Sequence, residues 1–184
     1  MKKVLYVCGS HSTGKSTLLD DVEKLLKVRK INYYRNISPR LLVPRELLYT
    51  TVNDLAQYRI TLSVLGNIME NYHSVDIIMT DRFLADNLVY AMSSPEISPH
   101  LITVHKQMFD YFMKEWKVVV LYLPIEFSLD PDGIHPLDEQ YRGKIDFELR
   151  KLLGQDSYYP ISGPHEKRLQ QVRLILKDEF KLEV

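Results

Sequence analysis

The stretch that decides the fold reads Gly9-Ser10-His11-Ser12-Thr13-Gly14-Lys15-Ser16-Thr17. It has the form G-x-x-x-x-G-K-[ST], in which the glycines let successive backbone N–H groups point inward and surround nucleotide phosphates. An apolar run with strand character, residues 3–8, precedes it, and a helical pattern, residues 15–29, follows it. A strand, a glycine-containing loop and a helix in this order predict a phosphate-binding loop at a helix N-terminus, whose dipole favours anions.

The residues that follow the second glycine have distinct predicted roles. Lys15 is expected to reach the outer phosphates of a nucleoside triphosphate, and the Ser16 hydroxyl is expected to coordinate Mg²⁺. We therefore predict a nucleotide site formed by residues 9–17, with ATP as the phosphoryl donor and Mg²⁺ as the cofactor. The sequence leaves the choice between ATP and GTP open.

Length and composition indicate an ordinary globular protein with a single domain, residues 1–184. Lys plus Arg and Asp plus Glu number 24 each, so there is no overall basic field of the kind that attracts nucleic acid, although a local patch remains compatible with a strand end. The single cysteine, Cys8, excludes an internal disulfide and favours a reducing compartment. Because there is no apolar run of about 18 residues and the first strand occupies the N-terminus, we expect a soluble cytoplasmic protein without a membrane partner or a signal peptide.

Apolar runs that resemble strands alternate with helical patterns along the chain. Strands are expected at residues 3–8, 30–37, 75–81, 117–123 and 158–161. Helices are expected at residues 15–29, 54–72, 84–92, 101–113, 141–153 and 165–180. In the helix at residues 54–72, apolar side chains recur every three or four residues and are expected to face the core. They are Leu55, Tyr58, Leu62, Leu65 and Met69.

This alternation predicts a three-layer α/β sandwich, with a parallel five-stranded sheet in the order 2-3-1-4-5 and helices on both faces. Ligands of such sheets bind beyond the carboxyl ends of the strands. The phosphate loop, residues 38–40, Asp81 with Arg82, and the segment 130–143 all follow predicted strands. We therefore expect them to converge on one rim of the sheet.

Asp81 closes a continuous apolar run and is the first candidate for catalysis. A carboxylate at this position can hold the water shell of a metal ion or accept a proton from an attacking hydroxyl group. Its structural alternative is the N-cap of the helix that follows. The planar guanidinium of Arg82 suits a phosphate or the orientation of that acid, with an ordinary surface arginine as the alternative.

The polar segment 130–143 joins a predicted buried strand to a helix and is too polar for a core. Phosphoryl transfer needs cations where charge develops and a cover that excludes water. A lid carrying Arg142, with His135 as a second candidate cation, would meet both needs. The alternative is a solvated connection in which Arg142 pairs with Asp138 or Asp146.

Three residues are candidates for contacts with an acceptor substrate. Arg40 follows the second strand and is placed to meet an acceptor, or else is a surface charge. Gln57 and Tyr58 lie early in the helix at residues 54–72. A glutamine amide can read a base edge and a tyrosine ring can stack on a base, while Tyr58 also fits the core stripe.

Several segments, in order along the chain, carry a resemblance. They are residues 9–17, Thr80-Asp81-Arg82-Phe83-Leu84-Ala85-Asp86-Asn87-Leu88-Val89-Tyr90-Ala91, Leu121-Tyr122-Leu123-Pro124, Asp132-Gly133-Ile134, Tyr141-Arg142 and Ile161-Ser162-Gly163. The chain resembles small P-loop kinase-like ATPases of prokaryotes and phages and, more distantly, ribosylnicotinamide kinase domains and nucleoside and nucleotide kinases. The resemblance implies that Asp81 and Arg82 form the acid–arginine pair, that Asp86 is a substrate-side residue, and that Arg142 belongs to the lid.

Two positions depart from this pattern. His135 stands where the resembling lids usually have an arginine, which favours Arg142 as the lid cation. Asn36-Ile37-Ser38 stands where many relatives have a glutamate, so recognition of an acceptor hydroxyl by that glutamate is not expected.

The predicted reaction is Mg²⁺-assisted transfer of the γ-phosphoryl group of ATP to a hydroxyl or phosphate of a nucleoside-like acceptor. One alternative is a polynucleotide kinase acting on a 5′-hydroxyl or on a modified base in DNA. A second is a nucleotide-hydrolysing switch without a small-molecule acceptor. The sequence leaves the acceptor and the oligomeric state, a homodimer included, open.

Overall fold

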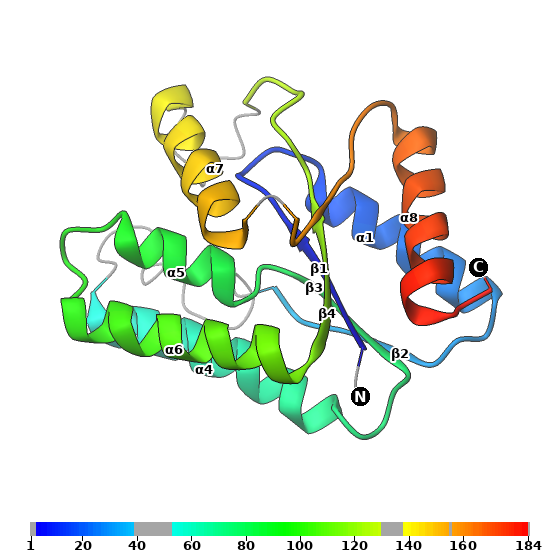
Figure 1. The fold of residues 1–184 in the computed structure, drawn as a ribbon, viewed down its shortest axis with the longest axis horizontal. Coiled ribbons are helices and arrows are strands. Elements are labelled where there is room, and N and C mark those ends of the chain that lie inside the picture. The colour runs from blue at the N-terminus through cyan, green and yellow to red at the C-terminus, as the bar shows by residue number, and fades with distance from the viewer. Residues whose placement is uncertain (1–2, 39–52, 130–137, 155, 184) are drawn as a thin grey trace.

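The computed structural model describes residues 3–38, 53–129, 138–154 and 156–183. Within these ranges five strands form one sheet in the order β2-β3-β1-β4-β5, and all four strand pairs are parallel (Figure 1). The strands are β1 (Lys3–Cys8), β2 (Tyr33–Arg35), β3 (Ile77–Asp81), β4 (Lys117–Tyr122) and β5 (Tyr159–Pro160). The predicted strand order is confirmed.

Helices cover both faces of the sheet, as the sequence predicted (Figure 1). One face carries α1 (Lys15–Val28) and α8 (His165–Phe180). The other carries α4 (Asp54–Asn71), α5 (Leu84–Met92), α6 (Pro99–Glu115) and α7 (Glu139–Leu153). None of the helices in the described part of the chain is long and apolar enough to cross a membrane.

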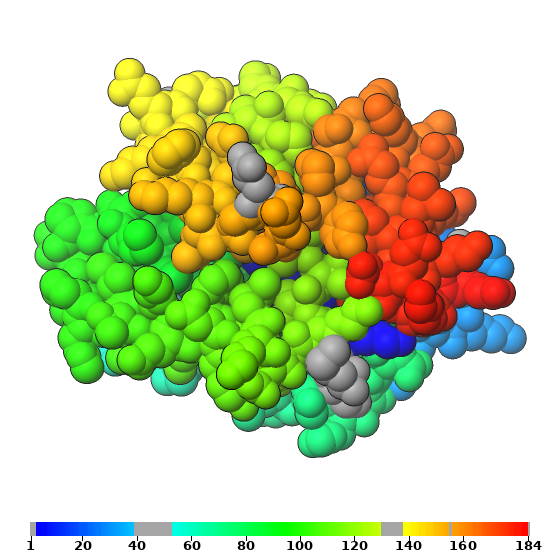
Figure 2. Space-filling view, in the orientation of Figure 1, coloured from blue at the N-terminus to red at the C-terminus, as the bar shows by residue number. Residues whose placement is uncertain are grey.

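Strand β1 lies at the centre of both cores. Val4, Tyr6 and Cys8 belong to the core under α4–α7, and Leu5 and Val7 belong to the core under α1 and α8. This division follows from the two-residue period of a strand, which sends neighbouring side chains to opposite faces. In the space-filling view of Figure 2, helices and loops hide nearly all of β1. A strand buried on both faces therefore requires the continuous apolar run that the sequence shows.

The predicted core face of α4 is wrong in part. Leu55, Leu62 and Met69 are 77%, 57% and 61% exposed, and of the predicted stripe only Leu65 is fully buried. The buried side chains of this helix are Ala56, Gln57, Ile60, Thr61, Val64, Leu65 and Ile68. The helix carries a second apolar row with a spacing of four residues, at positions 56, 60, 64 and 68, and this row faces the core. Periodicity alone does not decide between two apolar rows on one helix.

Helix α7 begins at Glu139, inside the predicted lid segment 130–143. The Asp138 carboxylate caps it by accepting hydrogen bonds from the backbone N–H groups of Gln140 and Tyr141, both at 2.9 Å. This start places Arg142 and Asp146 among the buried side chains of the helix. The remainder of the predicted lid, residues 130–137 with His135, lies outside the described residues.

Candidate active site

A cavity of about 900 Å³ lies at the carboxyl ends of the central strands. Its walls are residues 11–18 with Asp21, residues 35–38 at the end of β2, Asp81 and Arg82 at the end of β3, Phe127 and Ser128 after β4, and His165 and Arg168 of α8. The expected convergence is confirmed for the phosphate loop, Ser38, Asp81 and Arg82. This is the edge at which doubly wound parallel sheets bind ligands.

The two glycines of the phosphate loop (residues 9–17) are required by its backbone. Gly9 has φ +144°, and a Cβ atom there would lie 2.6 Å from the carbonyl oxygen of Leu123. Gly14 has φ +86° and stands directly before the first residue of α1, where it caps the helix without a side chain. The first-turn N–H groups of α1 are therefore available to an anion, and the first turn holds no acidic residue.

Lys15 lies inside the loop, with only 7% of its surface exposed. Its ammonium group donates hydrogen bonds to the carbonyl oxygens of Gly9, at 2.8 Å, and Ser10. Burial, assisted by the positive charge of Arg82, lowers the pKa of Lys15 to about 8. Lys15, the predicted partner of the outer phosphates, thus lies at the pocket in surroundings that favour its neutral form.

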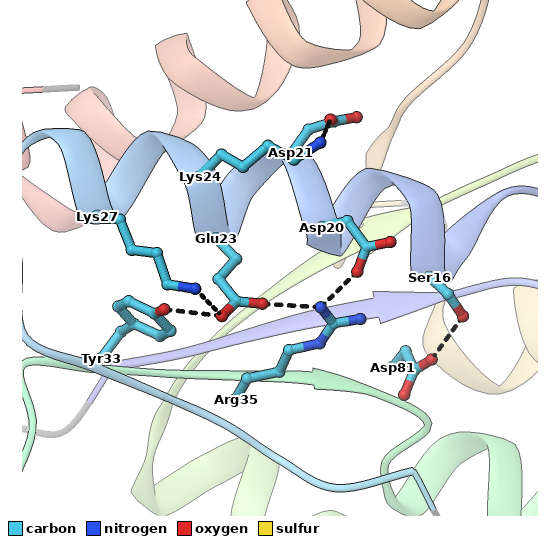
Figure 3. A network of polar contacts seen from close by, with 9 residues as sticks. All are labelled: Ser16, Asp20, Asp21, Glu23, Lys24, Lys27, Tyr33, Arg35 and Asp81. Atoms are coloured by element: carbon cyan, nitrogen blue, oxygen red, sulfur yellow. Dashed lines mark hydrogen bonds and ion pairs between the residues drawn. The ribbon is translucent and has the colours of Figure 1, made fainter.

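Ser16 and Asp81 meet across the floor of the pocket. The Ser16 hydroxyl donates a hydrogen bond of 3.0 Å to Oδ2 of Asp81 (Figure 3). Mg²⁺ prefers hard oxygen ligands and keeps several waters, so one hydroxyl and one carboxylate beside a phosphate site fit this ion. In the described part of the chain, no group of three or more His, Cys, Asp or Glu side chains forms a metal cage. The donor set therefore suits a metal ion that arrives with nucleotide phosphates.

Arg82 adopts φ +102°, a conformation that non-glycine residues rarely occupy. The turn is held by the Thr80 hydroxyl, which donates to the Arg82 carbonyl at 3.0 Å. The Arg82 guanidinium lies 5.3 Å from the centre of the Tyr90 ring, and the residue lines the pocket. Arg82 directly follows Asp81, the candidate metal ligand. Its strained backbone indicates that the local fold holds the guanidinium at the pocket wall.

Residues after β2 form the wall beside α1. Arg35 extends toward α1, and one guanidinium nitrogen contacts Asp20 at 2.5 Å and Glu23 at 2.9 Å (Figure 3). Hydrogen bonds from Lys27 and then Arg35 lower the pKa of Glu23 to about 2. This network holds the wall at the end of β2 against the helix that begins at the phosphate loop. Sequence reasoning missed Arg35, although its position at a strand end was a usable signal.

Other predicted acceptor residues lie away from the described pocket wall. The Gln57 amide is buried and donates to the carbonyl of Asn87 at 2.9 Å. Tyr58 is half-buried against the small core of Ala91, Ile97 and Leu101. The roles of Gln57 and Tyr58 toward a substrate stay predictions, and Arg40 lies outside the described residues.

Asp86 is buried below the pocket rather than on its wall. Its carboxylate accepts hydrogen bonds from the Tyr6 hydroxyl and from the N–H of Phe83, and burial raises its pKa. The contact with Tyr6 of β1 fixes the start of α5 against the central strand. Its predicted role at the substrate stays a prediction.

Arg142 does not lie where a lid cation was expected. Its side chain is fully buried on α7, and its hydrogen bonds run to carbonyl oxygens of His11, Ser12 and Phe127. Its carboxylate partner is Glu139, at 3.3 Å, in place of the predicted Asp138 or Asp146. Arg168 of α8 has an equivalent position, with a hydrogen bond of 2.8 Å to the carbonyl of Thr13. Arg168 lines the pocket but was not predicted, because a charged residue near the start of a charged helix carries no local signal.

No protein-family model matches the chain, and no curated protein matches its sequence significantly. A solved structure of NadR protein in complex with NR is similar, with a TM-score of 0.70 at 17% identity over 100% of this chain and 52% of that chain. NadR in complex with NAD and AMP-PNP gives 0.72 at 17% identity, over 100% and 51%. This chain therefore spans about half the length of the NadR chains.

A third structure is similar over nearly the full length of both chains. It is deoxyadenosine kinase from M. mycoides with the products dCMP and a flexible dCDP bound, with a TM-score of 0.61 at 12% identity over 95% of this chain and 98% of that chain. At such identities the likeness establishes the fold. The chain has the P-loop kinase fold, a three-layer sandwich around a parallel sheet with the order β2-β3-β1-β4-β5.

Proposed function

We propose that this protein transfers the γ-phosphoryl group of ATP to a hydroxyl or phosphate of a nucleoside-like acceptor. The observation that carries the proposal is the Ser16–Asp81 hydrogen bond in a cavity shared by the phosphate loop and the wall after β2. Donor phosphates and an acceptor would meet in that cavity, with the candidate metal ligands between them. The fold neighbours support this chemistry, since one NadR structure is a complex with NAD and AMP-PNP and the deoxyadenosine kinase structure holds nucleotide products.

Each residue has a defined part in the proposed transfer. The N–H groups of the phosphate loop and of the first turn of α1 bind the donor phosphates, and Lys15 exchanges its bonds to loop carbonyls for bonds to phosphate oxygens. Ser16 and Asp81 would hold Mg²⁺, which neutralises phosphate charge when bound. Asp81 also lies where it can accept the proton of an attacking hydroxyl, and Arg82 offers positive charge to the transferring group.

The proposal is tested by a transfer screen with γ-labelled ATP. Nucleosides, nucleoside monophosphates and short oligonucleotides are offered separately with Mg²⁺, and labelled products are resolved by chromatography. We expect a labelled nucleoside or nucleotide product that disappears with Lys15→Met. Label in oligonucleotides alone would instead favour a polynucleotide kinase, and release of phosphate at a rate independent of every acceptor would favour a hydrolysing switch.

A matched pair of variants ties the product to this cavity. Asp81→Asn removes the candidate metal ligand and base, whereas Asp76→Asn changes a carboxylate before β3, outside the residues that line the cavity. Transfer is expected to fall in the first variant and to persist in the second. Equal transfer by both would remove Asp81 from the mechanism.

A further inference from the structure

We propose that Arg142 and Arg168 are positioning residues that grip the phosphate loop by its carbonyl groups and turn its N–H groups toward the nucleotide. The geometry of this inference comes from hydrogen bonds of the described residues. Its consequence for nucleotide binding rests on the proposed function. It replaces the predicted lid role of Arg142 and gives a role to Arg168.

The grip of Arg142 is made by all three nitrogens of its guanidinium. Nε donates to the carbonyl of His11 and one terminal nitrogen donates to the carbonyl of Ser12, each at 3.1 Å. The other terminal nitrogen donates to the carbonyl of Phe127 at 2.8 Å. The same nitrogen also pairs with the Glu139 carboxylate at 3.3 Å. The side chain is 0% exposed, so a loss of the three carbonyl contacts would leave a buried cation with only this partner.

Arg168 holds the next carbonyl of the loop from the opposite layer of the sandwich. One terminal nitrogen donates to the carbonyl of Thr13 at 2.8 Å, and Nε donates to the carbonyl of Gly163 at 2.9 Å. The other terminal nitrogen forms a 2.6 Å ion pair with Glu126. Together, α7 and α8 thus hold three successive carbonyls of the loop.

The geometry of the peptide unit links these carbonyl contacts to the direction of the N–H groups that would bind the nucleotide. In a trans peptide the C=O of one residue and the N–H of the next point in opposite directions. When the carbonyls of His11, Ser12 and Thr13 face the two arginines, the following N–H groups, on residues 12–14, face away from them. Residues 12–14 line the cavity. Charge-assisted hydrogen bonds to the three carbonyls therefore preorganise the N–H donors that follow them.

The loop has a conformational reason to need such a grip. Ser12 has φ +56°, which is left-handed and unfavourable for a residue with a side chain. Its carbonyl is one of the two held by Arg142 within the loop. The preceding carbonyls, of Gly9 and Ser10, are held by Lys15, which must leave them to reach a phosphate. The arginine contacts can persist while Lys15 moves, because they lie on other carbonyls.

Both arginines also fix the segment after β4. Arg142 binds the Phe127 carbonyl, and the Arg168 guanidinium lies 4.9 Å from the centre of the Phe127 ring. Phe127 lines the cavity and is 50% exposed. The same two cations therefore set the distance between the phosphate loop and this aromatic wall.

The test compares each arginine with an exposed arginine of the same helix. Arg142→Met is paired with Arg150→Met in α7, and Arg168→Met is paired with Arg173→Met in α8. Binding of Mg·ADP is measured by calorimetry well below the melting temperature of each variant. We expect Arg142→Met and Arg168→Met to weaken binding by about tenfold to a hundredfold, the range of one or two lost charge-assisted hydrogen bonds. The paired controls should bind within about twofold of the wild type.

A lysine variant separates geometry from charge. Arg142→Lys keeps the positive charge but reaches fewer carbonyls, since it lacks the planar fork. Binding as weak as in Arg142→Met supports the grip, whereas full recovery of affinity with lysine would overturn it. Wild-type affinity in both methionine variants would also overturn it, and a wild type that binds no ADP would remove the proposed function instead.

A measurement on the wild type covers the case in which the variants fail to fold. The Nε–H signals of Arg142 and Arg168 are followed by NMR for exchange with water, with and without Mg·ADP. The grip predicts slow exchange in both states relative to exposed Arg173 of α8. Exchange of the Arg142 signal as fast as that of Arg173 in the free protein, or a shift of the Arg142 signal on ADP binding that reports a new phosphate contact, would overturn the inference.

Discussion

The titration of Lys15 predicts a specific loss of nucleotide affinity at alkaline pH. Burial lowers the pKa of this ammonium group to about 8 in the free protein. Bound phosphates carry negative charge and favour the protonated form, so binding raises the pKa. Between these two pKa values, binding takes up a proton and affinity falls as the pH rises.

The magnitude follows from the fraction of Lys15 that carries its proton in the free protein. With a pKa of about 8, that fraction is about 0.76 at about pH 7.5 and about 0.03 at about pH 9.5. If only the protonated form binds, affinity falls about 25-fold across this range, or about 1.9 kcal/mol. An unperturbed lysine, with a pKa of about 10.4, would change the affinity by little more than a tenth.

Calorimetry with Mg·ADP measures this effect directly, because the phosphates of ADP are already fully ionised across the chosen range. Titrations at about pH 8 in two buffers of different ionisation enthalpy should show uptake of about half a proton per ADP bound, the fraction of Lys15 that is neutral before binding. Lys15→Arg supplies a control cation that stays protonated throughout, so any residual binding should lose the pH dependence. An affinity that is constant from about pH 7.5 to about 9.5, without proton uptake, would refute the reasoning.

Three substitutions test other parts of the site and fold. Asp81→Asn should bind Mg·ADP within a few-fold of the wild type but lower kcat of transfer by about a hundredfold or more, because the hydroxyl–carboxylate pair with Ser16 is lost; an unchanged kcat would reduce Asp81 to a structural residue. Gly9→Ala should lower the free energy of unfolding by about 2–4 kcal/mol, as measured by urea denaturation, because its Cβ would lie 2.6 Å from the Leu123 carbonyl oxygen at φ +144°. Gly66→Ala is its matched control on α4, where a Cβ meets nothing within 4 Å, and should raise the free energy of unfolding by about 0.5–1 kcal/mol; a loss of stability as large as that of Gly9→Ala would contradict the role of the close approach.

Local patterns were sufficient for the order of elements and for the donor half of the site. Strand β1 is buried on both faces, and such strands show as continuous apolar runs. Asp81 could be placed near the phosphate loop because the predicted strand order puts the strand that ends at Asp81 beside the strand before the loop. The register confirms this order by pairing Val7 with Asp81. These predictions depend on signals that lie within a few residues of each other in the chain.

The errors arose where the deciding contact is distant in sequence or where two local patterns compete. Two apolar rows run along α4, and only packing against α5 and the sheet selects the one that contains Ile60 and Val64. Arg142 stands 131 residues from His11, and Arg168 stands 155 residues from Thr13. Nothing in the neighbourhood of either arginine distinguishes a lid cation from one buried against a loop, so their partners had to come from the tertiary structure.

Charge placement, rather than net charge, explains how a neutral chain presents a phosphate site. The cavity is lined by the cations Lys15, Arg35, Arg82 and Arg168 and by the acids Asp21 and Asp81. Two of these cations are balanced by carboxylates that do not line the cavity, Arg35 by Asp20 and Glu23, and Arg168 by Glu126. Beyond about 10 Å the electric fields of the opposite charges in each pair cancel and are screened by salt, so the pairs do not attract a long polyanion. A phosphate bound at the phosphate loop would lie in the same cavity as these guanidinium groups, and this supports the proposed compact nucleotide over a polynucleotide.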